Sequence, residues 1–283
     1  MTRRDRMLEA LAIGAQWLRR EVSPAPSPDD PNLSLLDDDA TVTKALAAMP
    51  TAVVANLPPT SAGMAAVPAT IGKDSPDGVA EAAGRHTDAD IAGMDWLALQ
   101  AAVADCTRCG LCKTRTRTVF GVGDPRAKWL FVGEGPGRNE DLQGEPFVGP
   151  AGKLLDNMLA AMALRRGRNA FIANVVKCRP TDANGKDRAP SVEEVAACKP
   201  YLLRQIALIA PDIMVALGKT AAVALVDCNP TTAVSKLRGV VHRHGTLPLV
   251  VTYHPAYLLR ALVDKRKAWE DLCLAMDAHA GIG

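Results

Sequence analysis

The sequence predicts an α/β fold in which a central, mostly parallel four-stranded sheet is flanked by helices. Two observations support it. Continuous apolar runs recur along the second half of the chain, as expected of strands buried on both faces. Stretches with helical spacing of apolar residues separate these runs, and strands that alternate with helices form parallel sheets. In such sheets, ligands bind at the carboxyl ends of the strands.

The expected elements follow in chain order. A helix over 96–106 has Trp96, Leu99 and Val103 as apolar positions. Strands are expected at 128–133, 170–176, 212–217 and 247–253, each an apolar run. Helices are expected at 152–164, at 191–209 and after Gly218, and 256–278 should be largely helical. Ser191 and Glu194 have the spacing of a capping box, which marks the start of the 191–209 helix.

The first third of the chain has a different composition. Residues 1–20 have the apolar spacing of a short amphipathic helix, and residues 21–93 form a Pro/Ala-rich linker that we expect to be disordered, with one short helix at 42–48. The helix at 1–20 is more typical of a solvated segment than of a binding one, although it could tether a partner protein. A folded α/β domain is expected at 94–283.

Composition sets wide bounds on function. The net charge of +2 neither demands nor excludes nucleic acid, because binding needs a local basic patch. No apolar run reaches the roughly 18 residues that a membrane span needs. Glu9 and Gln16 interrupt the N-terminal apolar stretch, which argues against an export signal. Seven cysteines, an odd number, then favour a reducing, cytoplasmic location without disulfides.

Four cysteines have a spacing that suggests a ligand set. Cys106 and Cys109 form a CxxC pair, Cys178 follows the second strand, and Cys198 lies in the next helix. Four thiolates can close a tetrahedral zinc site or hold an iron–sulfur cluster, and spacing alone does not choose between them. The alternative is that Cys178 and Cys198 are ordinary buried small hydrophobic residues.

Polar residues and tight turns follow the predicted strands. Glu134 lies in a Gly/Pro-rich turn directly after the first strand, and Phe147 lies in the constrained loop GEPFVG. Asn174 comes late in the second strand, where an amide is costly unless it finds partners. His254 follows the fourth strand, with a proline behind it. Each signal is weak alone, but all lie on the expected ligand side of the sheet.

A phosphate-binding loop was also considered. Residues 217–220 read LGKT, like the end of such a loop, but the pattern requires glycine at position 213 and the residue there is Ile213. We therefore reject a phosphate loop at this turn.

Together these motifs resemble the family 4 uracil-DNA glycosylases, the thermostable-type enzymes of the uracil-DNA glycosylase superfamily that carry a 4Fe-4S cluster. The matching stretches are CTRCGLCKTRTRTVFGVGDP, FVGEGPGRNEDLQGEPFVGPAGKLLD, NVVKCRP, IAPDIMVALGKTA, KLRG and HPAYLLR. They occur in the family's order and cover about Cys106 to Arg260, a little over half of the chain. The first hundred residues are outside the match.

The resemblance implies a monofunctional glycosylase that excises uracil and leaves an abasic site. It implies the cluster ligands Cys106, Cys109, Cys178 and Cys198, with a structural role for the cluster. Its motifs also assign roles in the reaction. Glu134 would steer the water or stabilise the positive sugar, and His254 would stabilise charge on uracil O2. The uracil-binding residues would be Gly135, Glu140, Phe147 and Asn174, with Phe147 stacking on the base, Asn174 reading its edge and Glu140 excluding thymine.

The implied substrate is uracil-containing DNA, single- or double-stranded, bound by a monomer with no membrane association. A base inside a duplex must be extruded before it can reach a pocket. Apolar side chains could fill the gap left in the stack, and basic ones could hold phosphates. The expected DNA-binding residues are Tyr257, Leu258, Leu259, Arg260, Arg115 and Arg117.

Two alternatives use the same fold. One is a protein that traps uracil covalently through a histidine in the loop before Cys198, but this loop reads GKDRAP and contains no histidine. The other is a non-catalytic DNA-binding protein, which should have lost Glu134, Asn174 or His254, and all three are present. Glu134 also argues against the related family 5, which lacks that carboxylate.

Overall fold

The computed structural model describes residues 86–226 and 228–282. Its centre is a six-stranded sheet with the order β1-β3-β2-β4-β6-β5. The four inner strands are parallel and match the predicted ones: β2 (Trp129–Gly133), β3 (Ala170–Asn174), β4 (Ile213–Leu217) and β6 (Leu247–Thr252). The antiparallel edge strands β1 (Val122–Gly123) and β5 (Val241–His244) were not predicted, because neither is a continuous apolar run.

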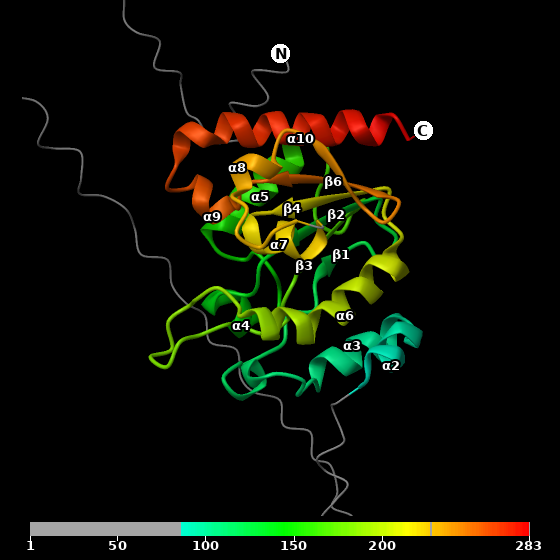
Figure 1. Ribbon diagram of the computed structural model, residues 1–283, viewed down its shortest axis with the longest axis vertical. Coiled ribbons are helices and arrows are strands. Elements are labelled where there is room, and N and C mark those ends of the chain that lie inside the picture. Colours follow the sequence, from blue (N-terminus) through cyan, green and yellow to red (C-terminus); the bar gives the residue numbers. More distant parts are fainter. Residues whose placement is uncertain (1–85, 227, 283) are drawn as a thin grey trace, which may run out of the picture. The chain divides into compact units, whose positions relative to one another are not determined.

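Helices cover both faces of the sheet (Figure 1). Among the described residues, β1 is preceded by α2 (Asp88–Gly93), α3 (Trp96–Ala104) and the 3-10 helix η1 (Gly110–Lys113). Next come α4 (Arg138–Gln143), α5 (Pro150–Ala161), α6 (Val192–Ile209), α7 (Lys219–Leu225) and α8 (Val234–Leu237). The chain continues with α9 (Pro255–Leu258), η2 (Leu262–Asp264) and α10 (Lys265–Ala280).

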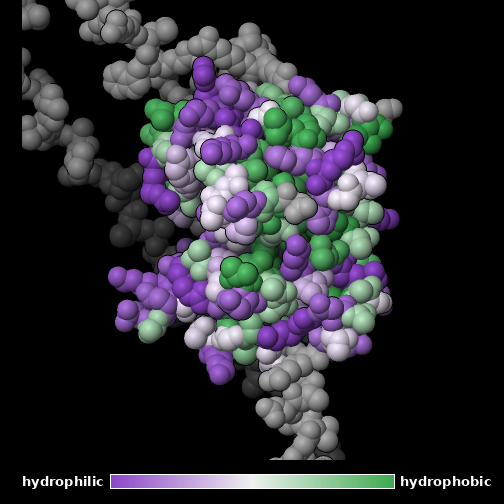
Figure 2. All heavy atoms as spheres, viewed as in Figure 1, coloured by the Kyte–Doolittle hydropathy of each residue, from purple (hydrophilic) through white to green (hydrophobic). Residues whose placement is uncertain are grey.

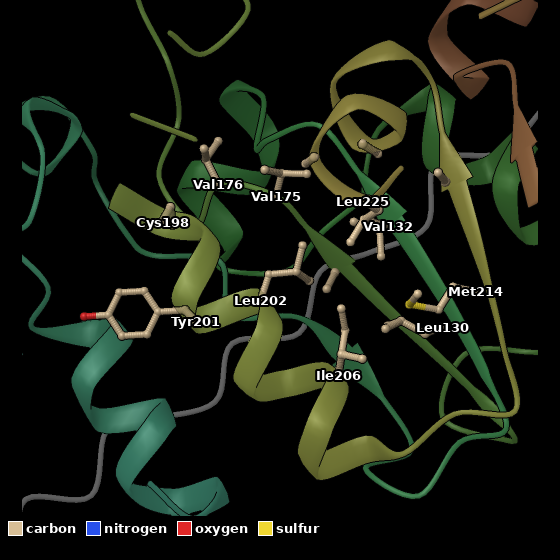
Figure 3. Packing of buried hydrophobic residues seen from close by; sticks show 14 of the residues in the cluster. Leu130, Val132, Val175, Val176, Cys198, Tyr201, Leu202, Ile206, Met214 and Leu225 are labelled. Atoms are coloured by element: carbon tan, nitrogen blue, oxygen red, sulfur yellow. The ribbon is translucent and has the colours of Figure 1, made fainter. Parts of the chain in front are cut away.

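Alternate residues of each inner strand pack into two separate cores. In β2, Leu130 and Val132 face a core built with α2, α3, α6 and α7, whereas Trp129 and Phe131 face a core built with α5 and α10. Figure 3 shows the first core, with side chains of α6 directed at those of the strands. This three-layer packing explains the unbroken apolar strands, since both faces of the sheet are buried.

Most predicted boundaries are within three residues of the observed ones, and two differences are larger. Residues 88–93 were assigned to the linker, but they form α2, whose Ile91 is fully buried and which packs on α6. The missed signal is a capping box between Thr87 and Asp90. The predicted helical stretch 256–278 is interrupted between α9 and α10. The expected helices at 1–20 and 42–48, and the rest of the linker, lie outside the described residues.

The surface of the described part carries mixed side chains. Figure 2 shows hydrophilic and hydrophobic residues interspersed over the face viewed. Among the described residues, no helix has both the length and the apolar character needed to cross a membrane.

Candidate active site and cysteine cavity

A cavity of about 230 Å³ opens at the carboxyl edge of the parallel strands. Glu134 follows β2, Asn174 ends β3 and His254 follows β6, so three residues predicted from separate motifs line one pocket. The pairing of Gly133 with Asn174 brings the ends of β2 and β3 level. The other lining residues are Gly135, Pro136, Gly137, Glu140, Phe147, Ala151, Pro180, Asp187, Arg188 and Ala256.

The Asn174 side chain is 2% exposed, and its Oδ1 has no hydrogen-bond partner among the described residues. A buried amide oxygen without a partner is costly, so this atom is a candidate for binding a ligand. Gly133, which pairs with Asn174, leaves room beside it: a Cβ on Gly133 would lie 2.6 Å from Phe147 Cζ and closer still to Asn174 Oδ1. The space between the ring and the amide therefore depends on a glycine.

Phe147 forms one wall of the pocket. Its φ of 56° lies in the left-handed region, which a non-glycine residue adopts only when its surroundings hold it there. Arg166 supplies that hold, because it donates to the carbonyl of Pro146 at 2.7 Å and to the carbonyl of Phe147 itself. Asp156 anchors the guanidinium, with 2.6 Å between Nε and Oδ1. Arg166 was not predicted as a site residue.

Glu140 links the pocket loops through its carboxylate. Oε2 accepts from the backbone N–H of Gly137 at 3.1 Å, and Oε1 accepts from Val148 and Gly149 at 3.0 and 3.4 Å. Both oxygens thus fix the loop that carries Phe147 to the start of α4. Glu140 also lines the pocket, and its predicted role in excluding thymine stays a prediction.

His254 caps the short helix α9. Its Nδ1 accepts from the backbone N–H of Ala256 at 3.2 Å, so in the neutral ring the proton is on Nε2. Burial, and secondarily the charge of Arg260, lower the pKa of His254 to about 4. The ring is therefore a neutral N–H donor near pH 7. It stacks on Phe147, with 5.5 Å between ring centroids and 29° between ring planes.

Glu134 has one described side-chain contact. Its Oε2 accepts a hydrogen bond from the hydroxyl of Thr220, at the start of α7. The backbone carbonyl of Glu134 accepts from Val176 at 3.2 Å, which holds the turn against the segment after β3. Thr220 was not predicted as a site residue, because its LGKT turn resembles only the end of a phosphate-binding loop.

A second, smaller cavity is lined by the predicted ligands Cys106, Cys109, Cys178 and Cys198. Burial raises the pKa of the Cys178 thiol to about 11 and that of Cys198 to about 12, and the neighbouring thiols add to both shifts. Cys112 does not line this cavity. Within the described part of the chain, no three His, Cys, Asp or Glu side chains are arranged to hold a metal ion.

Donors and cations surround these thiols. The backbone N–H of Lys177 donates to Cys198 Sγ at 3.2 Å, and that of Arg108 donates to Cys106 Sγ at 3.5 Å. The Lys177 side chain is 1% exposed and its Nζ donates to the carbonyl of Asn174 at 2.8 Å, so one segment joins the cysteine cavity to the pocket.

Comparison with known proteins agrees with this geometry. Residues 120–273, more than half of the chain, match the model of the uracil DNA glycosylase superfamily. The chain belongs to the uracil-DNA glycosylase superfamily. It is similar to the type-4 uracil-DNA glycosylases of Archaeoglobus fulgidus (46% identical over 164 residues, 56% of this chain and 79% of that protein) and Thermotoga maritima (45% over 159 residues, 56% and 80%). That of Pyrobaculum aerophilum is 38% identical over 187 residues, 64% of this chain and 93% of that protein. The resemblance to family 4 is thereby confirmed.

Two of the predicted DNA-binding residues have side chains engaged inside the protein. Leu258 is fully buried in the core with α5 and α10, so it cannot enter a gap in a base stack. Arg115 bonds only inward, to the carbonyls of Cys106 and Ala104 at 2.7 and 3.2 Å and to Cys178 Sγ at 3.3 Å. These bonds connect the guanidinium to the cysteine cavity, and its predicted phosphate contact stays a prediction.

The other DNA-binding candidates have exposed side chains. Tyr257 is 38% and Leu259 41% exposed, and the Tyr257 hydroxyl donates to Asp264 at 2.6 Å. Arg117 and Arg260 are also exposed. Their contacts with DNA stay predictions.

Proposed function

We propose that this protein is a monofunctional uracil-DNA glycosylase, which extrudes uracil from DNA and hydrolyses its bond to deoxyribose. The observation that carries the proposal is one pocket that combines a buried amide whose oxygen has no partner among the described residues (Asn174), an aromatic wall (Phe147), a neutral N–H donor (His254) and a carboxylate (Glu134). The names of the similar proteins, type-4 uracil-DNA glycosylases, support the same activity.

Recognition follows from the chemistry of the base. Uracil offers the N3–H donor and the O4 acceptor on one edge, and the Asn174 amide offers the complementary pair. Phe147 supplies a flat apolar face for stacking. The partnerless Oδ1 would then gain its missing donor when a base with an N3–H enters the pocket. An amide can discriminate in this way because its unpaired state is costly.

Hydrolysis breaks the bond between C1′ and N1, and the electron pair leaves with the base. Negative charge then grows on uracil O2, where the Nε2–H of His254 can donate to it. The Glu134 carboxylate would stabilise the positive charge on the sugar and orient a water molecule. The water oxygen bonds to C1′, and the proton that it releases passes by way of solvent to the uracil anion, so the products are free uracil and an abasic site.

We further propose that the cysteine cavity holds a 4Fe-4S cluster through Cys106, Cys109, Cys178 and Cys198. Although no three side chains of the described residues converge on a single metal ion, the chemistry of the donors suits such a group. Four thiols line one cavity, backbone N–H groups donate to two of the sulfurs, and cationic Arg115 would offset thiolate charge. When bound, the cluster would supply cross-links between the loop at 106–112, the end of β3 and α6. No step of the hydrolysis needs it.

The direct test uses a labelled oligonucleotide with one uracil, treated with alkali after incubation, beside a matched thymine oligonucleotide. Cleavage at uracil only is expected. Glu134→Ala and His254→Ala should each lower excision strongly and leave DNA affinity almost unchanged, because neither side chain is placed to bind the sugar–phosphate backbone of the DNA. Affinity that falls in step with activity would count against these roles. A protein–DNA adduct that survives denaturation would instead favour covalent trapping.

A further inference from the structure

The turn after β4 has no role in the function proposed so far. Its sequence, LGKT at 217–220, was rejected as a phosphate loop. In the sheet, β4 lies between β2 and β6, the strands that lead to Glu134 and His254. The turn is therefore next to both catalytic candidates, and it contacts each of them.

Thr220 contacts the first candidate. Its hydroxyl donates to Oε2 of Glu134, across a sequence separation of 86 residues. Among the described residues, no hydrogen bond involves the other oxygen, Oε1. The hydroxyl thus fixes one end of the carboxylate and leaves the other end available to water. A carboxylate with one oxygen fixed has less rotational freedom to lose when the reaction begins.

Gly218 contacts the second candidate. Its φ of +93° is in the region that glycine tolerates, and a Cβ there would lie 2.9 Å from His254 Cβ. Its N–H donates to the carbonyl of Thr252 at 2.9 Å, two residues before His254. The turn therefore allows His254 to pack against Gly218, and it fixes the backbone of Thr252, which leads to His254.

We propose that Thr220 is a positioning residue for Glu134, and that the 218–220 turn aligns the two catalytic side chains with each other. This rests on the proposed uracil-DNA glycosylase activity. Thr220 does not line the pocket, so it acts through Glu134 and not on the base. It deepens the mechanism by assigning the orientation of the carboxylate to a hydroxyl from a different strand end.

The test compares Thr220→Val, which keeps the shape and removes the hydroxyl, with Thr220→Ser, which keeps the hydroxyl. In single-turnover excision with enzyme in excess, Thr220→Val should react about tenfold more slowly, because a hydrogen bond to a charged group is lost. The Kd for uracil DNA should stay within about twofold, since no base contact changes. Thr220→Ser should restore most of the rate. Thr220→Ala repeats the measurement without the added methyl, and Thr232→Val is the matched control.

A double-mutant cycle decides whether Thr220 acts through Glu134. In a Glu134→Ala background, Thr220→Val should cause no further loss, because the carboxylate it would orient is absent. A tenfold loss in both backgrounds, or a wild-type rate for Thr220→Val, would overturn the inference and leave the proposed function intact. Failure of the wild-type protein to excise uracil would instead sink the proposed function itself.

Discussion

Replacing Gly133 by alanine tests the shape of the uracil pocket with a single carbon atom. The new Cβ would lie 2.6 Å from Phe147 Cζ and 2.7 Å from Cε2, where ordinary contacts begin at 3.4 Å, and it would also crowd Asn174 Oδ1. The Phe147 ring and the Asn174 amide must therefore each move away from the new Cβ by about 1 Å. A misplacement of that size in an active site can lower the reaction rate about a hundredfold. Gly133 itself has no positive φ, so the strand can accept alanine.

We expect Gly133→Ala to lower the single-turnover rate constant of uracil excision by about a hundredfold. Crowding of this kind typically costs about 1–3 kcal/mol of folding free energy, so Tm should fall by several degrees without loss of the fold. Excision is measured under single turnover, and affinity for undamaged DNA by fluorescence anisotropy. Gly93→Ala, at a glycine with no atoms within 4 Å of the added carbon, is the control. Wild-type excision by Gly133→Ala would show that the base does not bind between Phe147 and Asn174.

Three further predictions concern pH, positioning and the cysteines. Because the pKa of His254 is lowered to about 4, its neutral ring should keep donating down to about pH 5, so any loss of rate from its protonation should centre near 4, not 6.5. As the pH falls, the unfolded chain binds this proton before the folded chain does. The free energy of unfolding should therefore decrease as the pH falls from 6.5 to 4, and it should decrease less in His254→Asn, which urea unfolding at each pH would measure. Arg166→Gln should raise KM for uracil DNA severalfold by releasing the Phe147 loop; an unchanged KM would show that the loop holds without it. A protein with a 4Fe-4S cluster is brown. Cys198→Ser should therefore abolish the colour of the purified protein and lower its Tm, whereas Cys228→Ser should keep the colour and the wild-type Tm. A colourless wild-type protein that contains zinc would refute the cluster.

Much of the fold was predictable because local patterns decide it. The four inner strands are apolar on both faces, and Glu134, Asn174 and His254 could be placed because each ends such a strand. The edge strand β5 was not predictable in this way, since its residues alternate between exposed and half-buried. The geometry of the sheet then brought the three polar residues together, as parallel topology requires.

The errors and omissions have physical reasons as well. Leu258 was grouped with its neighbours, but in a one-turn helix adjacent side chains point in different directions, and Leu258 points into the core. The charge of Arg115 suggested a phosphate contact but gave no sign of its hydrogen bonds to the carbonyl of Cys106 and to Cys178 Sγ in the cysteine cavity. Thr220 reaches Glu134 through one hydrogen bond across 86 residues, and Arg166 holds the carbonyls of Pro146 and Phe147 across 20 and 19 residues; such contacts leave no periodic signal in the sequence.

The two antiparallel edge strands bear on how the protein behaves at high concentration. An exposed strand edge offers unpaired backbone groups on which another chain can add, and this is a common start of aggregation. Here β1 has only two residues, one of them Gly123, and β5 carries His242, Arg243 and His244. The long apolar strands are all inside the sheet, so neither edge offers a long, flat, apolar strand with which a second molecule could pair.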